Sequence, residues 1–360
     1  MQTTVKFVKK GAPRWVSGAI KTPAGAVSRV SSDWSRTDML GMIKSRMGAY
    51  RMHYTVPPGL YAVGEATRDS DVFVTANYKL SFDIVRRALK GMDAWFLVLD
   101  TQSINVWCAA GKGTFGTDEL VSQISVARLS EVVGHRRIIL PQLGAVGVSA
   151  ARVNKETGFR VSFGPVEARD IPAYVAAGYK KTKEMSLVKF SMLDRLVLTP
   201  MEINPIMKKY PWFAGAVLLL FGLAPTGILF QQAWQGGLPF LALGLAAVFA
   251  GAFVTPVLLP FVPFRSFAMK GWITGMLITF LTMQAMGGAT GQSALLLAAI
   301  YLFFPALSSY IALQFTGSTT YTGMSGVNKE LKIGIPLYII TTVVSLLLVV
   351  LFKLREWEVL

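Results

Sequence analysis

Residues 95–117 read WFLVLDTQSINVWCAAGKGTFGT and decide the fold of the first half of the chain. The stretch opens with 95–99, an apolar run that has the length and residue types of a strand buried on both faces. Polar residues follow from Asp100, and the single cysteine, Cys108, comes soon after. Because ligands of open α/β sheets bind beyond the carboxyl ends of the strands, this loop is a candidate binding segment.

Two interpretations of Cys108 follow from the residues alone. Free cysteines are often small buried hydrophobes, but the alanines and glycines beside Cys108 leave room for a large flat ligand. Lys112, four residues on, would stabilise a thiolate if the segment is helical. A phosphate-binding P-loop is excluded, because it requires a glycine where Val106 stands and a serine or threonine where Gly113 stands.

The segment 105–112, NVWCAAGK, resembles the N-(V/I)-W-C-A-(A/G)-G-K cap-helix motif of the corrinoid protein of microbial mercury methylation, the HgcA family. The similarity continues through 113–117 and extends to the layout of the whole chain. That family is similar in turn to the corrinoid subunit of the carbon monoxide dehydrogenase/acetyl-CoA synthase system. The resemblance implies an α/β Rossmann-like corrinoid-binding domain followed by an all-α polytopic membrane domain.

The resemblance also implies an activity and its partners. It implies a corrinoid-dependent methyltransferase that passes a methyl group from cobalt to mercuric ion and releases methylmercury. Cys108 would be the catalytic residue and the metal ligand, its thiolate binding the lower face of cobalt in a base-off cobalamin. A ferredoxin-like iron-sulfur protein would donate electrons, and a methyl-folate-dependent system would supply methyl groups.

Two other functions remain open. One is a corrinoid methyl carrier of acetyl-CoA (one-carbon) metabolism, which would share the fold; the Trp107–Cys108 pair and the membrane domain argue against it. The other is a membrane-anchored binding or sensor protein without catalysis, in which Cys108 is merely buried.

A binding edge is also predicted without the resemblance. Strands alternate with helices over residues 60–180, which indicates a mostly parallel sheet whose loops after Val74, Leu99, Leu140 and Phe163 share one edge. These loops and the motif supply the candidate cofactor-binding residues, although the polar ones are equally good turn or cap residues. The candidates are Thr75, Asn77, Asp100, Thr101, Asn105, Val106, Trp107, Cys108, Ala109, Ala110, Gly111, Lys112, Gly113, Gln142 and Gly144.

Composition divides the chain into four segments: a basic arm and helix (1–55), the α/β domain (56–185), a charged connector (186–210) and a membrane domain (211–360). Residues 1–35 are expected to be an irregular arm or a disordered tail. The helical pattern of 36–51 places its apolar residues in the core. Those residues are Met39, Leu40, Met42, Ile43 and Met47.

Hydropathy predicts about five membrane spans in the second half, and the chain is 52% hydrophobic. The predicted spans are 212–232, 238–259, 268–287, 293–314 and 334–352. Their basic loops place the chain in the inner (cytoplasmic) membrane, in contact with lipid, with the α/β domain in the cytoplasm. Because residues 212–264, 271–328 and 333–352 contain no Asp, Glu, Lys, Arg or His, the domain is expected to anchor rather than to transport ions. The polar segment 315–326 is either a docking loop or a flexible connector.

The charge balance and the cysteine count exclude several classes of site. Residues 1–210 carry 30 Lys and Arg against 17 Asp and Glu, an excess that suits an acidic partner or anionic headgroups. The basic residues are dispersed and form no nucleic-acid-binding pattern. One cysteine cannot form an internal disulfide or hold a four-cysteine cluster, so electrons must come from another protein. His53 and His135 lack metal-ligand spacing.

Overall fold

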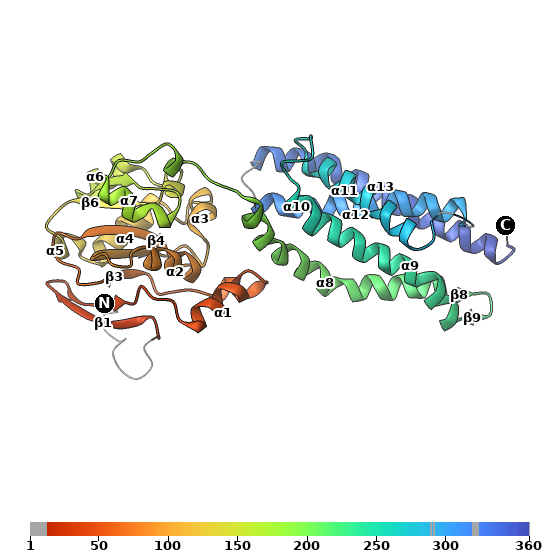
Figure 1. Cartoon of the computed structure of the whole chain (residues 1–360), viewed down its shortest axis with the longest axis horizontal. Coiled ribbons are helices and arrows are strands. Elements are labelled where there is room, and N and C mark those ends of the chain that lie inside the picture. The colour runs from red at the N-terminus through yellow and green to blue at the C-terminus, as the bar shows by residue number, and fades with distance from the viewer. Residues whose placement is uncertain (1–12, 289, 291, 319–323, 360) are drawn as a thin grey trace. The chain divides into compact units, whose positions relative to one another are not determined.

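The computed structural model describes residues 13–288, 290, 292–318 and 324–359 (Figure 1). The chain separates into two units, Met1–Lys189 and Phe190–Leu360. The first unit is built on a sheet and the second on long helices. Each unit has its own buried core.

Within the described residues, the first unit has one seven-stranded sheet in the order β1-β2-β3-β5-β4-β6-β7. Strands β5, β4, β6 and β7 are parallel, β3 runs antiparallel to β5, and β1 and β2 form an antiparallel hairpin. The expected mostly parallel α/β sheet is confirmed. The strands are β1 Val16–Thr22, β2 Gly25–Val30, β3 Gly59–Val63, β4 Asp71–Ala76, β5 Ala94–Leu99, β6 Arg137–Leu140 and β7 Arg160–Phe163.

The β1–β2 hairpin corrects the expectation of an irregular arm before residue 36. Its strands turn at Gly25, whose φ of 119° favours glycine, and β2 pairs in parallel with β3. Val27 and Val30 of β2 are buried, so the hairpin adds to the core. Residues 16–30 are rich in serine, glycine and alanine, so their sequence lacks the apolar alternation typical of a strand. In the structure, however, burial alternates every two residues along β1. Residues 1–12 of the expected arm lie outside the described residues.

Helices cover both faces of the sheet. Strand β5 is buried along its whole length, as expected, because Trp95, Leu97 and Leu99 face one core while Phe96 and Val98 face the other. Helices α3 Val106–Lys112, α4 Thr117–Val126, α5 Leu129–Val132 and α6 Ala150–Thr157 pack on the first face, and α2 Lys79–Ala88 and α7 Ile171–Ala176 pack on the second. Short 3₁₀ turns lie at Ala49–His53, Gln142–Gly144, Ala168–Asp170 and Glu184–Ser186.

The connections define a switch point in the sheet. The chain passes from β4 to β5 through α2 on one face, and from β5 to β6 through α3, α4 and α5 on the other. Strands β4 and β6 are neighbours. The chain leaves the carboxyl end of β4 toward α2 on one face and the carboxyl end of β6 toward α6 on the other. In open α/β sheets the ligand crevice lies at such a point.

Helix α1 Arg36–Ser45 lies where a helix was predicted, but its apolar residues are not core. Met39, Leu40 and Ile43 are about half exposed, as is Met47 just beyond the helix. The buried side of α1 instead consists of Asp38, Gly41 and Ser45. The expected core assignment is therefore wrong for the exposed residues.

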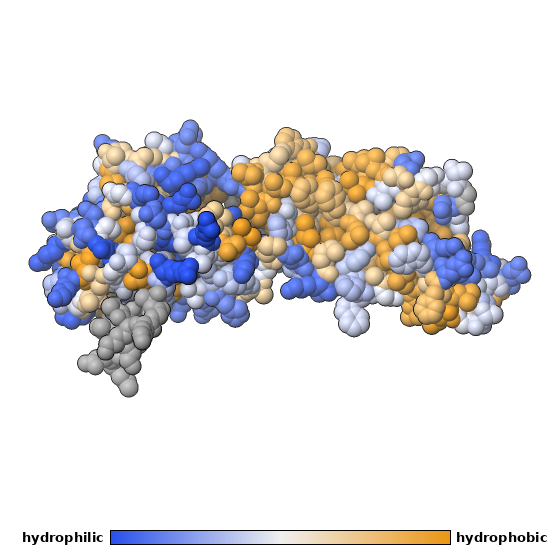
Figure 2. Space-filling model, turned by 60° about the horizontal axis from the view of Figure 1, so that its bottom comes forward, coloured by the Kyte–Doolittle hydropathy of each residue, from blue (hydrophilic) through white to orange (hydrophobic). Residues whose placement is uncertain are grey.

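The second unit consists of long helices (Figure 1). Three of them, over the described residues, are long and apolar enough to cross a membrane: Phe230–Val257, Ala294–Gln314 and Ser325–Glu356. Hydrophobic residues cover much of the face of this unit that Figure 2 shows. Its elements are α8 Met192–Gly222, β8 Leu223–Ala224, β9 Gly227–Ile228, α9 Phe230–Phe249, a π-turn Ala250–Val254, α10 Thr255–Val257, α11 Phe267–Ala285, α12 Ala294–Gln314, a 3₁₀ turn Phe315–Ser318 and α13 Met324–Glu356.

The structure supports three candidate spans, and it corrects the boundaries of another. The expected span 212–232 is not one helix, because α8 ends at Gly222 and a hairpin turning at Gly227 (φ 127°) precedes α9. Most of the expected connector 186–210 is helical, since α8 begins at Met192. The expected span 268–287 corresponds to α11, which carries Lys270 and is not among the three. Of the expected docking loop 315–326, residues 319–323 lie outside the described residues.

Small residues bring α11 and α12 together. A Cβ added to Gly271 would lie 2.5 Å from Ala312 Cβ, and one added to Gly275 would lie 2.6 Å from Ser308 Cβ. Ser308 Oγ donates to the Gly271 carbonyl at 2.9 Å. This small-xxx-small contact with an interhelical hydrogen bond is typical of helices that pack in a bilayer.

Candidate functional site

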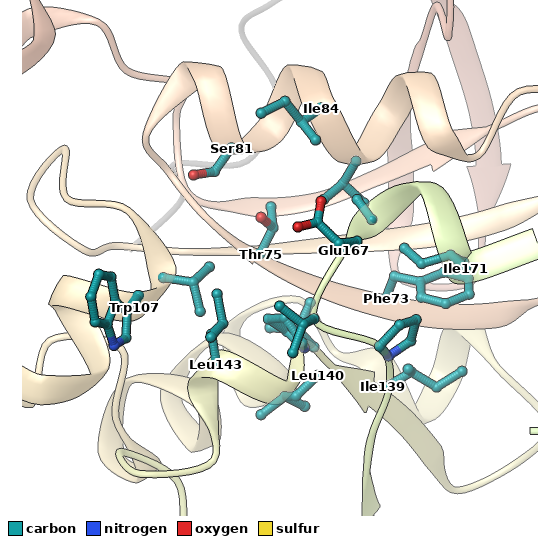
Figure 3. A pocket seen from close by; sticks show the side chains of 18 of the residues that line it. Phe73, Thr75, Ser81, Ile84, Trp107, Ile139, Leu140, Leu143, Glu167 and Ile171 are labelled. Atoms are coloured by element: carbon teal, nitrogen blue, oxygen red, sulfur yellow. The ribbon is translucent and has the colours of Figure 1, made fainter. Parts of the chain in front are cut away.

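A cavity of about 320 Å³ opens at the switch point between β4 and β6 (Figure 3). Its walls come from the carboxyl ends of these two strands, the segment after β7, the first turns of α2 and the start of α3. Most of the lining is apolar, including Phe73, Leu140, Leu143 and Ile171. A largely apolar cleft with few polar groups is the usual form of a small-molecule site.

Four of the predicted site residues line this cavity: Thr75, Asn105, Val106 and Trp107. Thr75 is buried at the end of β4. Trp107 is 37% exposed and stands at one end of the cavity in Figure 3. The motif and the strand end, which lie far apart in sequence, therefore meet at one site.

Other lining residues did not emerge from the sequence. Ser81 and Ile84 come from α2, and Glu167 comes from the segment after β7. Figure 3 shows the Glu167 carboxylate in the same part of the cavity as the hydroxyls of Thr75 and Ser81. The only sequence signal was the predicted strand exit at Gly164 and Pro165, both of which line the cavity. Ser81 lies in the first turn of α2, which begins at Lys79.

Asn77 organises the turn that follows β5 rather than lining the cavity. Its Nδ2 donates to Asp100 Oδ1 at 2.9 Å, and its Oδ1 accepts from Thr101 N at 3.0 Å and from Thr101 Oγ1 at 2.9 Å. Two residues of this turn, Gln102 (φ 56°) and Ser103 (φ 63°), adopt left-handed backbone conformations that are uncommon outside glycine. The predicted residues Asn77, Asp100 and Thr101 thus hold a strained turn that sets where α3 begins.

Asn105 and Gly113 define the ends of α3. The Asn105 side chain accepts a hydrogen bond from the Cys108 backbone N–H at 2.9 Å and caps the helix. Gly113 ends the helix in the left-handed region (φ 83°). Lys112 follows Cys108 by one helical turn, so the segment between them is helical, as expected.

The remaining motif residues divide between core and surface. Ala109 and Ala110 are buried against the sheet, whereas Gly111, Lys112 and Gly113 are exposed. Cys108 is half-buried, is not disulfide-bonded, and does not line the cavity that its neighbours line. A Cβ added to Gly111 or Gly113 would meet nothing within 4 Å, so open space lies over this part of α3.

Gln142 and Gly144 lie at the exit of β6 but have structural contacts instead of lining the cavity. Gln142 Oε1 accepts a hydrogen bond from Lys181 Nζ, and burial lowers the pKa of that lysine. A Cβ added to Gly144 would lie 2.5 Å from Phe115 Cε1. Phe115, which belongs to the 95–117 stretch, is fully buried, and its ring packs against Gly144.

The geometry suits a flat ligand with an apolar body and a polar rim. The cavity is at the lower end of the volume range of ligand sites, so it accommodates one part of a larger ligand. The open space over the glycines of α3 leaves room for the rest. Cys108, half-buried on the same helix, carries a soft sulfur atom of the type that binds soft metals.

The comparisons with known proteins concern this unit. A family described as CO dehydrogenase/acetyl-CoA synthase delta subunit matches residues 34–175. The gamma subunit of the acetyl-CoA decarbonylase/synthase complex of Archaeoglobus fulgidus is 31% identical over 122 residues, 33% of this chain and 26% of that protein. The corresponding subunit of Methanothermobacter thermautotrophicus is 29% identical over 143 residues, 38% of this chain and 31% of that protein.

A third relative is the corrinoid/iron-sulfur protein large subunit of Moorella thermoacetica, which is 28% identical over 151 residues, 39% of this chain and 33% of that protein. The chain thus spans about a quarter to a third of the length of these relatives. The matched residues 34–175 contain all the cavity lining except Val188. The α/β unit is therefore related to the corrinoid-protein subunits of the carbon monoxide dehydrogenase/acetyl-CoA synthase system, as the sequence led us to expect.

Proposed function

We propose that the α/β unit binds a corrinoid at the β4/β6 edge and serves as a methyl carrier and methyltransferase. The observation that carries the proposal is the cavity at the switch point, built from the segment that is related to corrinoid-protein subunits. When bound, a corrinoid supplies a cobalt centre that accepts and releases methyl groups. The protein's part is to bind, orient and shield this cofactor.

The described residues fit such a cofactor. Trp107, Val106 and the apolar strand ends would contact its apolar parts, while Thr75, Ser81 and Glu167 provide hydrogen-bonding groups for its amides. We propose that the Cys108 thiolate is the lower cobalt ligand, held in place by the Asn105 cap on its backbone. A thiolate donates strongly to a metal, as it does in thiolate-ligated haem.

The methyl acceptor separates two candidate functions. The relatives favour a methyl carrier of acetyl-CoA metabolism. The 105–112 motif, with its Trp107–Cys108 pair, favours mercuric ion as the substrate and methylmercury as the product. Because one cysteine cannot hold an iron-sulfur cluster, a separate ferredoxin-like protein would supply electrons, and a methyl-folate-dependent system would supply methyl groups.

The second unit would serve as the membrane anchor. Three of its helices are long and apolar enough to cross a bilayer, and α11 packs closely against one of them, α12. We therefore propose that α11 and the end of α8 also cross, giving five spans in the inner membrane. The basic balance of residues 1–210 supports a cytoplasmic position for the α/β unit.

Visible spectra of the full chain, purified without oxygen and supplied with cobalamin, test the cofactor proposal. We expect the parent to hold base-off cobalamin, and Cys108→Ala to hold it with a changed spectrum and at least about 100-fold less methyl transfer, because a cobalt ligand is lost. Lys155→Ala, an exposed position on α6 that does not line the cavity, is the control and should keep the parent spectrum.

The outcomes separate the parts of the proposal. Failure of every variant to retain cobalamin would exclude corrinoid binding. Identical spectra for the parent and Cys108→Ala would exclude the cysteine ligand alone. Offering the methyl-loaded protein either mercuric ion or an acetyl-CoA synthase then shows which acceptor it uses.

A further inference from the structure

Helix α1 presents its apolar side outward. We define the α1 surface as Met39, Leu40, Ile43 and Met47, which are 53%, 55%, 49% and 48% exposed. At 100° per residue Met39, Leu40 and Ile43 fall within one arc of the helix, and Met47 follows just beyond its end. The opposite side, Asp38, Gly41 and Ser45, is the side that is buried. Amphipathic helices of globular proteins have the reverse arrangement, so this surface is built to meet something other than water.

Polar contacts prevent α1 from turning its apolar side inward. Asp38 accepts from Lys79 Nζ at 2.9 Å and lies 2.9 Å from Arg86 Nη2, and both cations are buried. Rotating the helix would remove the Asp38 carboxylate from the buried cations Lys79 and Arg86. A buried charge that loses its partner destabilises the fold. Gly41 packs so closely on the Tyr54 ring that a Cβ there would lie 2.1 Å from its hydroxyl. These contacts therefore fix the orientation of α1 with its apolar side outward.

Cations flank the α1 surface. Arg46 and Lys44 lie at the two edges of the apolar arc, and Arg36 lies at its amino-terminal end. Beside it is a cavity of about 620 Å³ between α1 and α2, lined by Arg46, Arg87 and Lys90. The one acid in this lining, Asp33, is paired with Lys90 at 2.7 Å. The surroundings of the apolar surface thus favour an anion.

We propose that the α1 surface docks on an anionic phospholipid bilayer. The four apolar side chains would enter the headgroup boundary, and the cations of the adjacent cavity would contact lipid phosphates. Three candidate membrane-spanning helices follow in the same chain, so this unit stays near a bilayer at high effective concentration. This docking does not depend on what the β4/β6 cavity binds.

Fluorescence quenching in nanodiscs tests the docking on the full chain. In a Cys108→Ser background, Ile43→Cys carries an environment-sensitive fluorophore, and Val126→Cys is the matched control because Val126 is an exposed apolar residue of α4. The discs contain doxyl-labelled lipid in phosphatidylcholine alone or mixed with phosphatidylglycerol. We expect quenching at position 43 that needs phosphatidylglycerol and weakens with salt, and none at position 126.

A second pair of variants tests the cations. Arg87→Gln and Lys90→Gln should each weaken docking about fivefold, whereas Lys155→Gln on α6 should not change it. If position 43 behaves like position 126 in both lipids, docking on lipid is wrong and a protein partner becomes the better explanation. Equal quenching at position 43 in both lipids would overturn the preference for an anionic bilayer.

Discussion

Both units have apolar cores, but the surfaces that they expose differ. Leu97 of β5 is fully buried, whereas Leu347 of α13 is 57% exposed. In the first unit, apolar strands form the interior and water contacts the polar helix faces. In the second unit, glycines, serines and buried polar groups add to the apolar helix contacts, and most apolar side chains of α13 point outward. The apolar content of a helix therefore does not by itself show whether its exposed face meets water or lipid. The kind of residue on its buried face is needed as well.

Helix α1 belongs to the first unit but resembles the helices of the second. Its buried side is polar and its exposed side is apolar, as in α13, whose Lys353 is buried and donates to Glu356 at 2.6 Å and to the Phe221 carbonyl at 3.3 Å.

The largest effect should come from breaking the buried charge cluster of the first unit, which consists of Asp38, Lys79, Asp83 and Arg86. Arg86 is fully buried, lies 2.7 Å from Asp83 Oδ1 and donates to the Ser31 carbonyl at 2.5 Å. Arg86→Leu should lower the free energy of unfolding of this unit by about 3–5 kcal/mol, because two buried carboxylates would keep one cation. Urea-dependent proteolysis of the full chain measures the loss. Lys90→Leu, which removes an exposed ion pair, should cost less than about 1 kcal/mol, and equal costs would contradict the cluster's role.

An intermediate effect should come from the small-residue contact of the second unit. Gly275→Ala places a methyl group 2.6 Å from Ser308 Cβ, and overpacking of this kind costs about 1–3 kcal/mol. Gly215→Ala in α8 is the matched control, since a Cβ there meets nothing within 4 Å and alanine favours the helix. Thermal unfolding in detergent should show a lower midpoint for the first variant only. A lower midpoint for both would indicate that glycine itself, rather than close packing, matters.

The smallest effect should be a pH dependence of the charge cluster. Burial acts to raise the pKa of Asp38, but hydrogen bonds from Ser35 and Lys79 outweigh it and hold that pKa well below its usual range. The stability that this lowered pKa contributes is present above the unfolded pKa of about 3.9 and is lost as pH falls toward the folded pKa. Burial raises the pKa of Asp83 despite Lys79 and Arg86, so its protonation has the opposite sign.

The stability difference between the parent chain and Asp38→Asn should therefore shrink as pH falls from about 5 to about 2. Proteolytic stability at stepped pH measures this difference. Asp69→Asn is the control, because Asp69 is exposed and its carboxylate is in none of the ion pairs found among the described residues. A difference for Asp38→Asn that stays constant over this range would show that the carboxylate charge does not contribute.

Much of the first unit was predictable from residue patterns. The apolar run 95–99 predicted a doubly buried strand, and the alternation of strands and helices predicted the parallel sheet and its loop edge. Thr75 and the 105–107 part of the motif were correctly expected at that edge, because loops at the carboxyl ends of parallel strands converge. Their contact with a corrinoid stays a prediction.

Other parts of the site had no local signal. Ser81 and Glu167 reach the cavity because α2 and the segment after β7 pass over the switch point, which depends on strand order. Asn77 and Gln142 hydrogen-bond to Asp100 and Lys181, and their contact with a cofactor stays a prediction. Partners so distant in sequence are chosen by the packing of whole elements.

By itself, the sequence determined the division into an α/β unit and a helical apolar unit, the strand at 95–99 and the binding edge beside it, because local periodicity sets which residues can be buried. Only the tertiary structure decided which side of α1 faces inward, where the helix beginning at Met192 ends, and which side chains close the cavity. The physical reason is that buried charges such as Asp38, Lys79 and Arg86 must find one another across the fold, and their pairing can outweigh the apolar pattern of a single helix.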